Sequence, residues 1–267
     1  MKVPVYGLKG EVKGEVTLGK AFTHPVRTDI IRRALLAEES VKRQPYGSDP
    51  IAGLRTSAEY IGTRSERNSM MNKEMSRMKR IFSTGYMRFR ARAIPGSVKG
   101  RKAHPPKAEK VWLKKVNKKE RLFAILSAIS ATADKKLVMA RGHMIEEVKH
   151  IPLVVEDGFQ ELKRTSDVEA TLMALGFGKE LERCGETKTR AGRGKSRGRR
   201  VIRRKGPLIV IDSDKGIGKA ARNIPGVDVM PMDRLTVGML APGAAPGRVT
   251  VWTKSAADTI SKLTEGA

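Results

Sequence analysis

Two internal segments hold most of the positive charge of this chain. Residues 44–110 contain 15 Lys and Arg against 5 Asp and Glu, and residues 183–205 contain 11 against 1. These 90 residues carry a net charge of +20, out of +26 for all 267 residues. Because like charges repel, neither segment is expected to pack compactly by itself. The sequence therefore predicts a near-neutral folded body, residues 1–43 and 111–267, with two basic extensions, a loop at 44–110 and a segment at 183–205.

The composition limits the class of protein that this body can be. Hydrophobic residues make up 39% of the chain before glycine is counted, which is enough for a buried core and excludes disorder as the main state. A single cysteine, Cys184, excludes an internal disulfide framework and a cysteine-based zinc site. No apolar run reaches the ~18 residues of a membrane span, and residues 1–4 do not begin a signal peptide. We expect a soluble, cytoplasmic protein whose partner is a polyanion and not a membrane.

Short apolar runs alternate with amphipathic segments, mostly after residue 117. Strands are predicted at residues 3–6, 11–17, 137–140, 151–155, 208–211, 227–230 and 249–252. Helices are predicted at residues 29–44, 117–133, 166–176, 215–223 and 256–263. This alternation predicts an α/β fold in which a mostly parallel sheet has helices on both faces.

Polar residues mark where the predicted helices begin. Thr28 and Ser255 are candidate N-caps of the first and last helix. Asn117 and Ser166 each have a glutamate three residues later, which is the spacing of a capping box. The helix after Asn117 is expected to bury its apolar residues Leu122, Phe123, Ile125, Leu126 and Ile129.

Residues 44–110 lose regular periodicity because proline and glycine interrupt them repeatedly. A connection of this length without regular structure is either functional or disordered, and we predict a long extended basic loop. Inside it, Met71, Met75, Met78 and Phe82 recur at helical spacing. Two interpretations are open here: a short helix that docks its methionines on the body or on a neighbouring protein, and a basic helix that lies on RNA.

The segment 183–205 has the chemistry of a phosphate-binding surface. Arginine presents a planar fork of donors that binds a phosphate through two parallel hydrogen bonds, and the interspersed glycines let the backbone approach closely. Aromatic residues make up only 4% of the chain, which argues against general single-strand binding and favours a folded RNA. The predicted RNA-binding residues of this segment are Lys188, Arg190, Arg193, Lys195, Arg197, Arg199, Arg200, Arg203, Arg204 and Lys205.

The loop 44–110 uses the same residue types at wider intervals. Arg88, Arg90 and Arg92 alternate, so in an extended chain their side chains would project to one side. Such a loop can thread between RNA helices and become ordered through phosphate contacts. Its predicted RNA-binding residues are Arg55, Arg88, Arg90, Arg92, Lys99, Arg101, Lys102, His104 and Lys107.

Enzyme chemistry finds little support in the sequence. Residues 216–221 match part of a dinucleotide-binding fingerprint, but Asp212 and Asp214 precede them where a pyrophosphate would lie. An ordinary strand-to-helix turn with Asp214 as N-cap is the alternative. No histidine has metal-ligand spacing, and although Arg183 can lower the pKa of Cys184, a half-buried helix-end residue is the better interpretation. We predict no catalytic residue, no metal site and no cofactor, and keep a nucleotide-dependent enzyme as the rival.

Several motifs, in order along nearly the whole chain, resemble one protein family. The chain is similar to the fourth protein of the large ribosomal subunit, in its archaeal and eukaryotic form. The residues His104–Lys107 indicate the archaeal branch. The motifs that carry the resemblance include Tyr46–Asp49, Ala52–Thr56, Val98–Lys107, Lys118–Arg121, Thr187–Arg200, Ala221–Gly226 and Leu240–Gly243.

The resemblance implies a structural, non-enzymatic protein with a Rossmann-like body. It implies binding to large-subunit (23S-class) rRNA early in assembly, with the loop reaching the wall of the peptide exit tunnel. Neighbouring large-subunit ribosomal proteins and the nascent peptide are then further partners. An RNA-binding assembly factor or chaperone that leaves the mature ribosome is the alternative. Carried onto this chain, the tunnel tip of the loop contains Gly62, Thr63, Arg64 and Arg67.

Overall fold

The computed structural model describes residues 1–265 and contains two compact units. The first unit comprises Met1–Ser40 and Lys114–Ala267, and the second comprises Val41–Leu113. Both apolar core clusters consist of residues from the first unit, so the body has its own core.

A six-stranded sheet lies at the centre of the first unit, in the order β2-β1-β3-β8-β6-β7. Only the β1–β2 pair is antiparallel; the other neighbours in this sheet run parallel. Every residue of β3, β6 and β8 is buried, as expected for strands covered on both faces. The strands are β1 (Lys2–Tyr6), β2 (Val12–Thr17), β3 (Leu153–Val155), β6 (Leu208–Ile211), β7 (Asp228–Pro231) and β8 (Thr250–Thr253).

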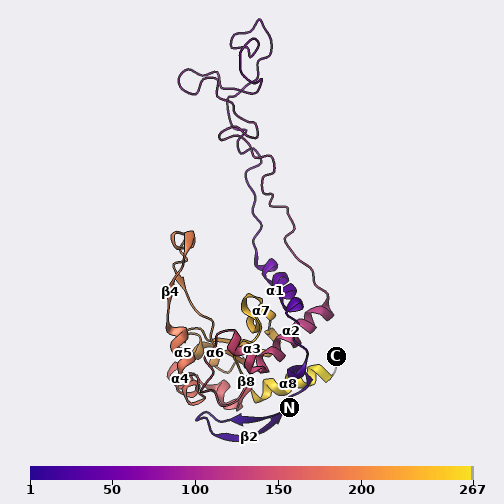
Figure 1. The fold of residues 1–267 in the computed structure, drawn as a ribbon, viewed down its shortest axis with the longest axis vertical. Coiled ribbons are helices and arrows are strands. Elements are labelled where there is room, and N and C mark those ends of the chain that lie inside the picture. The colour runs from indigo at the N-terminus through magenta and orange to yellow at the C-terminus, as the bar shows by residue number, and fades with distance from the viewer. Residues whose placement is uncertain (266–267) are drawn as a thin grey trace. The chain divides into compact units, whose positions relative to one another are not determined.

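Helices cover both faces of the sheet, which confirms the predicted fold class. Along β6, Leu208 and Val210 belong to one core cluster, while Ile209 and Ile211 belong to the other, because successive strand residues point to opposite faces. Figure 1 shows α4, α5 and α6 gathered at one side of the body and α1, α2 and α8 at the other. The helices are α1 (Thr28–Lys42), α2 (Lys118–Ala133), α3 (Lys135–Ala140), α4 (Thr165–Ala174), α5 (Gly178–Gly185), α6 (Ile217–Ala221), α7 (Val237–Leu240) and α8 (Lys254–Glu265).

The apolar run 137–140, predicted as a strand, is helical. It forms most of α3, where the carboxylate of Asp134 accepts a hydrogen bond from the Lys136 amide at 2.8 Å and caps the helix. A run of four apolar residues fits a buried strand or one side of a helix equally well. The cap from Asp134 favours the helical state.

The helix starts were predicted within a few residues, but the capping side chains were not. Thr28 and Ser255 lie inside α1 and α8, and Ser166 lies inside α4. Asn117 is the N-cap of α2, yet its side chain makes no capping hydrogen bond. Its expected partner, Glu120, instead accepts a hydrogen bond from Arg33 at 3.1 Å.

The predicted burial of the α2 apolar residues was only partly correct. Ile129 is buried, but Leu122 and Phe123 remain 41% and 49% exposed. The buried side of α2 consists mainly of small residues such as Ala124 and Ala128, which allow close packing on the core. The larger side chains line an apolar groove on the body instead.

The methionine-rich stretch 70–82 is not helical, so both helix interpretations were wrong. Asn72 has a φ of 56°, in the left-handed region that interrupts a right-handed helix. Arg80 forms antiparallel bridges to Glu59 and Ala91, which holds this part of the loop in an extended form. The spacing of the methionines was therefore no sign of a helix.

Candidate nucleic-acid interface

The segment 188–202 forms a hairpin arm that extends from the body after α5 (Figure 1). Two short antiparallel strands, β4 (Lys188–Thr189) and β5 (Val201–Ile202), pair at its root. The Arg190 amide donates to the Arg200 carbonyl at 2.7 Å and continues the ladder. Gly198 takes a left-handed conformation, with a φ of 77°, where the chain turns back.

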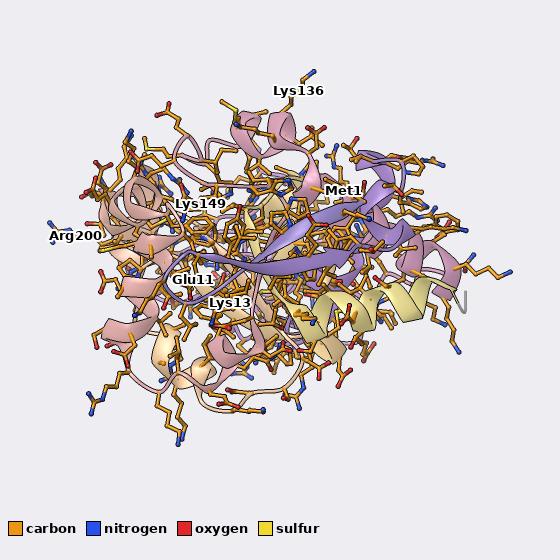
Figure 2. All side chains as sticks on the ribbon, turned by 90° about the horizontal axis from the view of Figure 1, so that it is seen from below. Met1, Glu11, Lys13, Lys136, Lys149 and Arg200 are labelled. Carbon is orange, nitrogen blue, oxygen red and sulfur yellow. The ribbon has the colours of Figure 1, made fainter. Side chains whose placement is uncertain are left out.

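The arm presents its cations to solvent, as the sequence predicts for an RNA-binding surface. Arg200 lies at the edge of the molecule and points away from the sheet (Figure 2). The Nε of Arg190 donates to the Arg199 carbonyl at 2.9 Å, and Arg204 forms an exposed ion pair with Glu186. The exposed cations of the arm and its root are Lys188, Arg193, Lys195, Arg197, Arg199, Arg200, Arg203, Arg204 and Lys205.

Ion pairs and hydrogen bonds connect the root of this arm, residues 203–206, to the body. Arg183 donates to the Lys205 carbonyl at 2.8 Å, and Lys205 forms an ion pair with Asp228 at 2.9 Å. The enclosed guanidinium of Arg248 donates to the Gly206 carbonyl and to Asp228. The Lys205 side chain, predicted to bind RNA, is 53% exposed while its ammonium pairs with Asp228.

A second buried cluster lies directly beside this root. Glu180 is fully buried and accepts hydrogen bonds from Arg183 at 2.6 and 2.8 Å, and from the Met144 amide at 2.9 Å. The Nδ1 of His143 lies 2.6 Å from the same carboxylate. Burial raises the pKa of Glu180, but the hydrogen bonds from His143, Arg183 and Met144 outweigh it and lower the pKa to about 2.

Cys184 belongs to this cluster as an inert residue. Its side chain is buried, and burial together with the nearby Glu180 charge raises the pKa of the thiol to about 11. The lowering effect of Arg183 on this pKa is smaller. The preferred interpretation, a residue at a helix end, is confirmed, although Cys184 is fully buried and not half-buried. The packing is close: a Cβ on Gly206 would lie 2.6 Å from the cysteine sulfur.

In the loop, the three alternating arginines do not project to one side as the sequence suggests. Phe89 has a φ of 60°, so the chain turns between them. Arg88 lies over the Phe89 ring and Arg90 over the Tyr86 ring. Arg92 is 8% exposed and donates to the Val98 carbonyl, which makes it a residue that shapes the loop.

The other predicted loop residues are mostly exposed. Arg55 forms an ion pair with Asp49 at 2.7 Å. Of the residues predicted to form the tip, Thr63, Arg64 and Arg67 are exposed and Gly62 is half-buried. The Met70 amide donates to the Ile61 carbonyl at 2.9 Å and closes the segment between them. The remaining exposed residues of this set are Lys99, Arg101, Lys102, His104 and Lys107.

Comparison with known proteins decides which family this architecture represents. Residues 16–263 match the model of the ribosomal protein L4/L1 family. The chain belongs to this family. It is 46% identical over 264 residues to the large ribosomal subunit protein uL4 of Nanoarchaeum equitans, with 97% of each chain covered. It is 44% identical to the proteins of that name from Archaeoglobus fulgidus and Methanopyrus kandleri, again with 97–98% of each chain covered.

In open parallel α/β sheets, ligands bind in the crevice at the carboxyl ends of the strands, so this edge shows whether a nucleotide site is present. In this chain, side chains and amides that follow β3, β6 and β8 form hydrogen bonds with one another at this edge. Asp157 accepts hydrogen bonds from the Ser255 amide and hydroxyl and from Gln160. Gln160 in turn accepts one from the Ser213 amide at 3.1 Å. The polar groups at this edge therefore bind one another.

The turn before α6 has the same character. The carboxylate of Asp214 accepts hydrogen bonds from the Gly216 and Gly218 amides at 3.0 and 3.1 Å, which are the donors that a pyrophosphate would use. The alternative of an ordinary turn held by Asp214 is therefore correct, although Gly216 is the N-cap residue.

Among residues 1–265, no helix is long and apolar enough to cross a membrane.

Proposed function

We propose that this chain is a structural protein of the large ribosomal subunit that binds large-subunit rRNA. The family assignment, with relatives matched over nearly their full length, carries this conclusion. The role is non-enzymatic, and its place is the ribosome in the cytoplasm. The interface consists of the arm 188–202 and the loop 44–110.

The design of the two extensions supports this role. The arm offers arginines and glycines on a hairpin whose base is held by a strand pair and by ion pairs, which leaves fewer conformations to be ordered when RNA binds. Preorganisation of this kind reduces the entropy lost on binding. The exposed cations of the arm contact phosphates and recognise the shape of a folded RNA.

The loop is assigned to a different task. We propose that it passes between rRNA helices during early assembly and that its tip, Gly62–Arg67, forms part of the wall of the peptide exit tunnel. Its length, its exposed cations and the turn closed by Met70 and Ile61 support this assignment. Neighbouring large-subunit proteins and the nascent peptide are then its other contacts.

The two alternative functions are less well supported. A nucleotide-dependent enzyme would need an open crevice at the sheet edge, where Asp157, Gln160 and Ser255 bind one another. An assembly factor that leaves the mature particle finds no support among the relatives, whose names describe components of the large subunit.

Sedimentation of a lysate on a sucrose gradient tests the proposal. The chain is detected by blotting, before and after a high-salt wash. Retention in the large subunit through the wash is the expected result. Release by the wash, or migration at the top of the gradient, would identify a peripheral RNA-binding factor and contradict an integral ribosomal role.

A further inference from the structure

We propose that a cleft in the second unit receives one unpaired nucleotide of the bound RNA. This inference rests on the proposed RNA-binding function and adds a specific subsite to it. The cleft has a volume of about 820 Å³, within the ~300–1,000 Å³ of typical small-ligand sites. Its lining combines the aromatic rings of Tyr46 and Trp112 with the cations Lys102, Lys107 and Lys110 and the imidazole of His104.

The aromatic part of the cleft is built for stacking. The rings of Tyr46 and Trp112 are nearly parallel, with an interplanar angle of 16° and 6.0 Å between their centroids. The Cζ of Arg43 lies 3.6 Å and the Nζ of Lys110 4.5 Å from the ring centroid of Trp112. Both cations therefore form cation–π contacts with this ring. Tyr46 remains 52% exposed and offers open ring surface to an incoming base.

The hydrogen-bonding groups of the cleft fit the same ligand. The indole Nε1 of Trp112 is enclosed and has no acceptor among residues 1–265, which leaves a donor unsatisfied beside the rings. A nucleobase carries carbonyl and ring-nitrogen acceptors. Lys102, His104 and Lys107 are exposed around the cleft and can contact the phosphates on either side of the base.

The two walls of the cleft are held together by the backbone. The Ser48 amide donates to the Pro106 carbonyl at 3.1 Å. Gly47 is needed for this approach, because a Cβ there would lie 2.8 Å from the backbone nitrogen of Ala108. A segment whose cations repel one another therefore keeps a defined cleft near its beginning and end.

The chemistry favours RNA over an acidic peptide as the occupant. A peptide carboxylate would use the cations but would leave the stacked, exposed ring without a partner. An unpaired base uses the ring and brings its phosphates to the cations. Glu109 is the one acidic residue in the lining, and it can be avoided by a phosphate placed beside Lys102 and His104.

The test compares two RNA hairpins that differ by one bulged adenosine, titrated against the full-length chain. Trp112 provides the signal, because the other tryptophan, Trp252, is fully buried in the body. We expect the bulged hairpin to bind about tenfold more tightly and to quench Trp112, as base–aromatic stacking predicts. Equal binding of both hairpins would overturn the subsite and leave the RNA-binding function intact, whereas no binding of either would contradict the function itself.

Variants locate the effect at the cleft. Tyr46→Leu should abolish the preference for the bulge, while Tyr46→Phe should keep it because the ring remains. Tyr60→Leu is the matched control, since Tyr60 is 47% exposed in the same unit and lies outside the cleft. Gly47→Ala should weaken the preference by separating the walls. A preference that survives in Tyr46→Leu, or quenching of Trp112 by a poly-glutamate peptide that competes with RNA, would overturn the proposal.

Discussion

The carboxylate of Asp228 lies 2.6 Å from the guanidinium of Arg248, a side chain with no exposed surface. Asp228 also pairs with Lys205, the last residue of the basic segment 183–205. This ion pair thus lies where the basic segment 183–205 ends. The same carboxylate therefore contacts a buried cation of the body and the last cation of the basic segment.

Removing the acidic partner of this pair should destabilise the body strongly. In Asp228→Ala, the guanidinium of Arg248 stays buried without its counter-charge, and we expect a loss of about 3 kcal/mol in the free energy of unfolding. Urea denaturation measures the loss. Glu161→Ala removes the exposed pair with Lys215 and should leave stability nearly unchanged. A loss in Asp228→Ala as small as that of the control would show that the pair contributes little.

The buried carboxylate of Glu180 should make stability fall in acid. Its pKa is about 2 in the folded chain against an ordinary value of 4.5, so its contribution is fully present above about pH 4.5 and is lost as the pH falls toward 2. That contribution is about 3 kcal/mol at neutral pH, and Glu180→Gln should remove most of it. Unfolding measured at several pH values should show the variant and the wild-type chain converging in acid. Glu182→Gln, exposed in the same helix, is the control, and a gap that does not narrow in acid would contradict the assignment.

The thiol of Cys184 should resist alkylation in the folded chain. A pKa of about 11 against an ordinary 9.0 leaves about 100-fold less thiolate at pH 8, and burial slows access further. Iodoacetamide labelling followed by mass spectrometry measures the rate. The chain has one cysteine, so the protein unfolded in urea provides the reference. Native labelling within tenfold of that reference would contradict the buried, inert role.

The parts of the fold that depend on local pattern were predictable from the sequence. Continuous apolar runs such as 208–211 identified the central strands, and amphipathic spacing identified the longer helices. Two of the expected capping side chains, Ser255 and Glu120, were not predictable because they bind partners far away in the sequence. Ser255 hydrogen-bonds Asp157, which lies 98 residues away in the sequence, and Glu120 pairs with Arg33 from α1.

The candidate interface was likewise predictable in part: its location was, but the partners of its individual cations were not. Charge density identified both basic extensions. It gave no sign of which cations bind other groups of the protein. Arg92 and Lys205 look like their neighbours in the sequence, yet one is buried in the loop and the other pairs with Asp228. Glu180 and Arg248 are fully buried charges that sequence reasoning missed, because an isolated charged residue ordinarily indicates an exposed position.

Deleting residues 62–85 should leave the body folded. Neither core cluster contains a residue from 41–113, and the second unit forms its own contacts, such as the bridge between Glu59 and Arg80. We expect an unchanged melting temperature and an unchanged near-ultraviolet signal from Trp252, which packs edge-on against Phe22 in the core. Loss of that signal would show that the methionine-rich stretch belongs to the core of the body.

Neutralising the arm should lower RNA affinity and make it less sensitive to salt. In the combined variant Arg193→Gln, Arg197→Gln, Arg199→Gln and Arg200→Gln, four exposed guanidinium groups are removed. Each phosphate contact contributes roughly 0.7–0.9 to the slope of log affinity against log salt, so the slope should decrease by about 3. Filter binding to transcribed large-subunit rRNA, repeated over a series of salt concentrations, measures both quantities.

The matched control removes the same charge from the body. Lys2, Lys9, Lys135 and Lys136 are exposed and lie outside both extensions, and Figure 2 shows Lys136 pointing into solvent. Their combined replacement by Gln lowers the net charge equally but touches no predicted phosphate contact, so its slope should stay close to that of the wild-type chain. A decrease of equal size in both variants would mean that RNA responds to the overall charge of the protein. The arm would then have no special part in binding, because long-range attraction alone, without phosphate contacts, would explain the affinity.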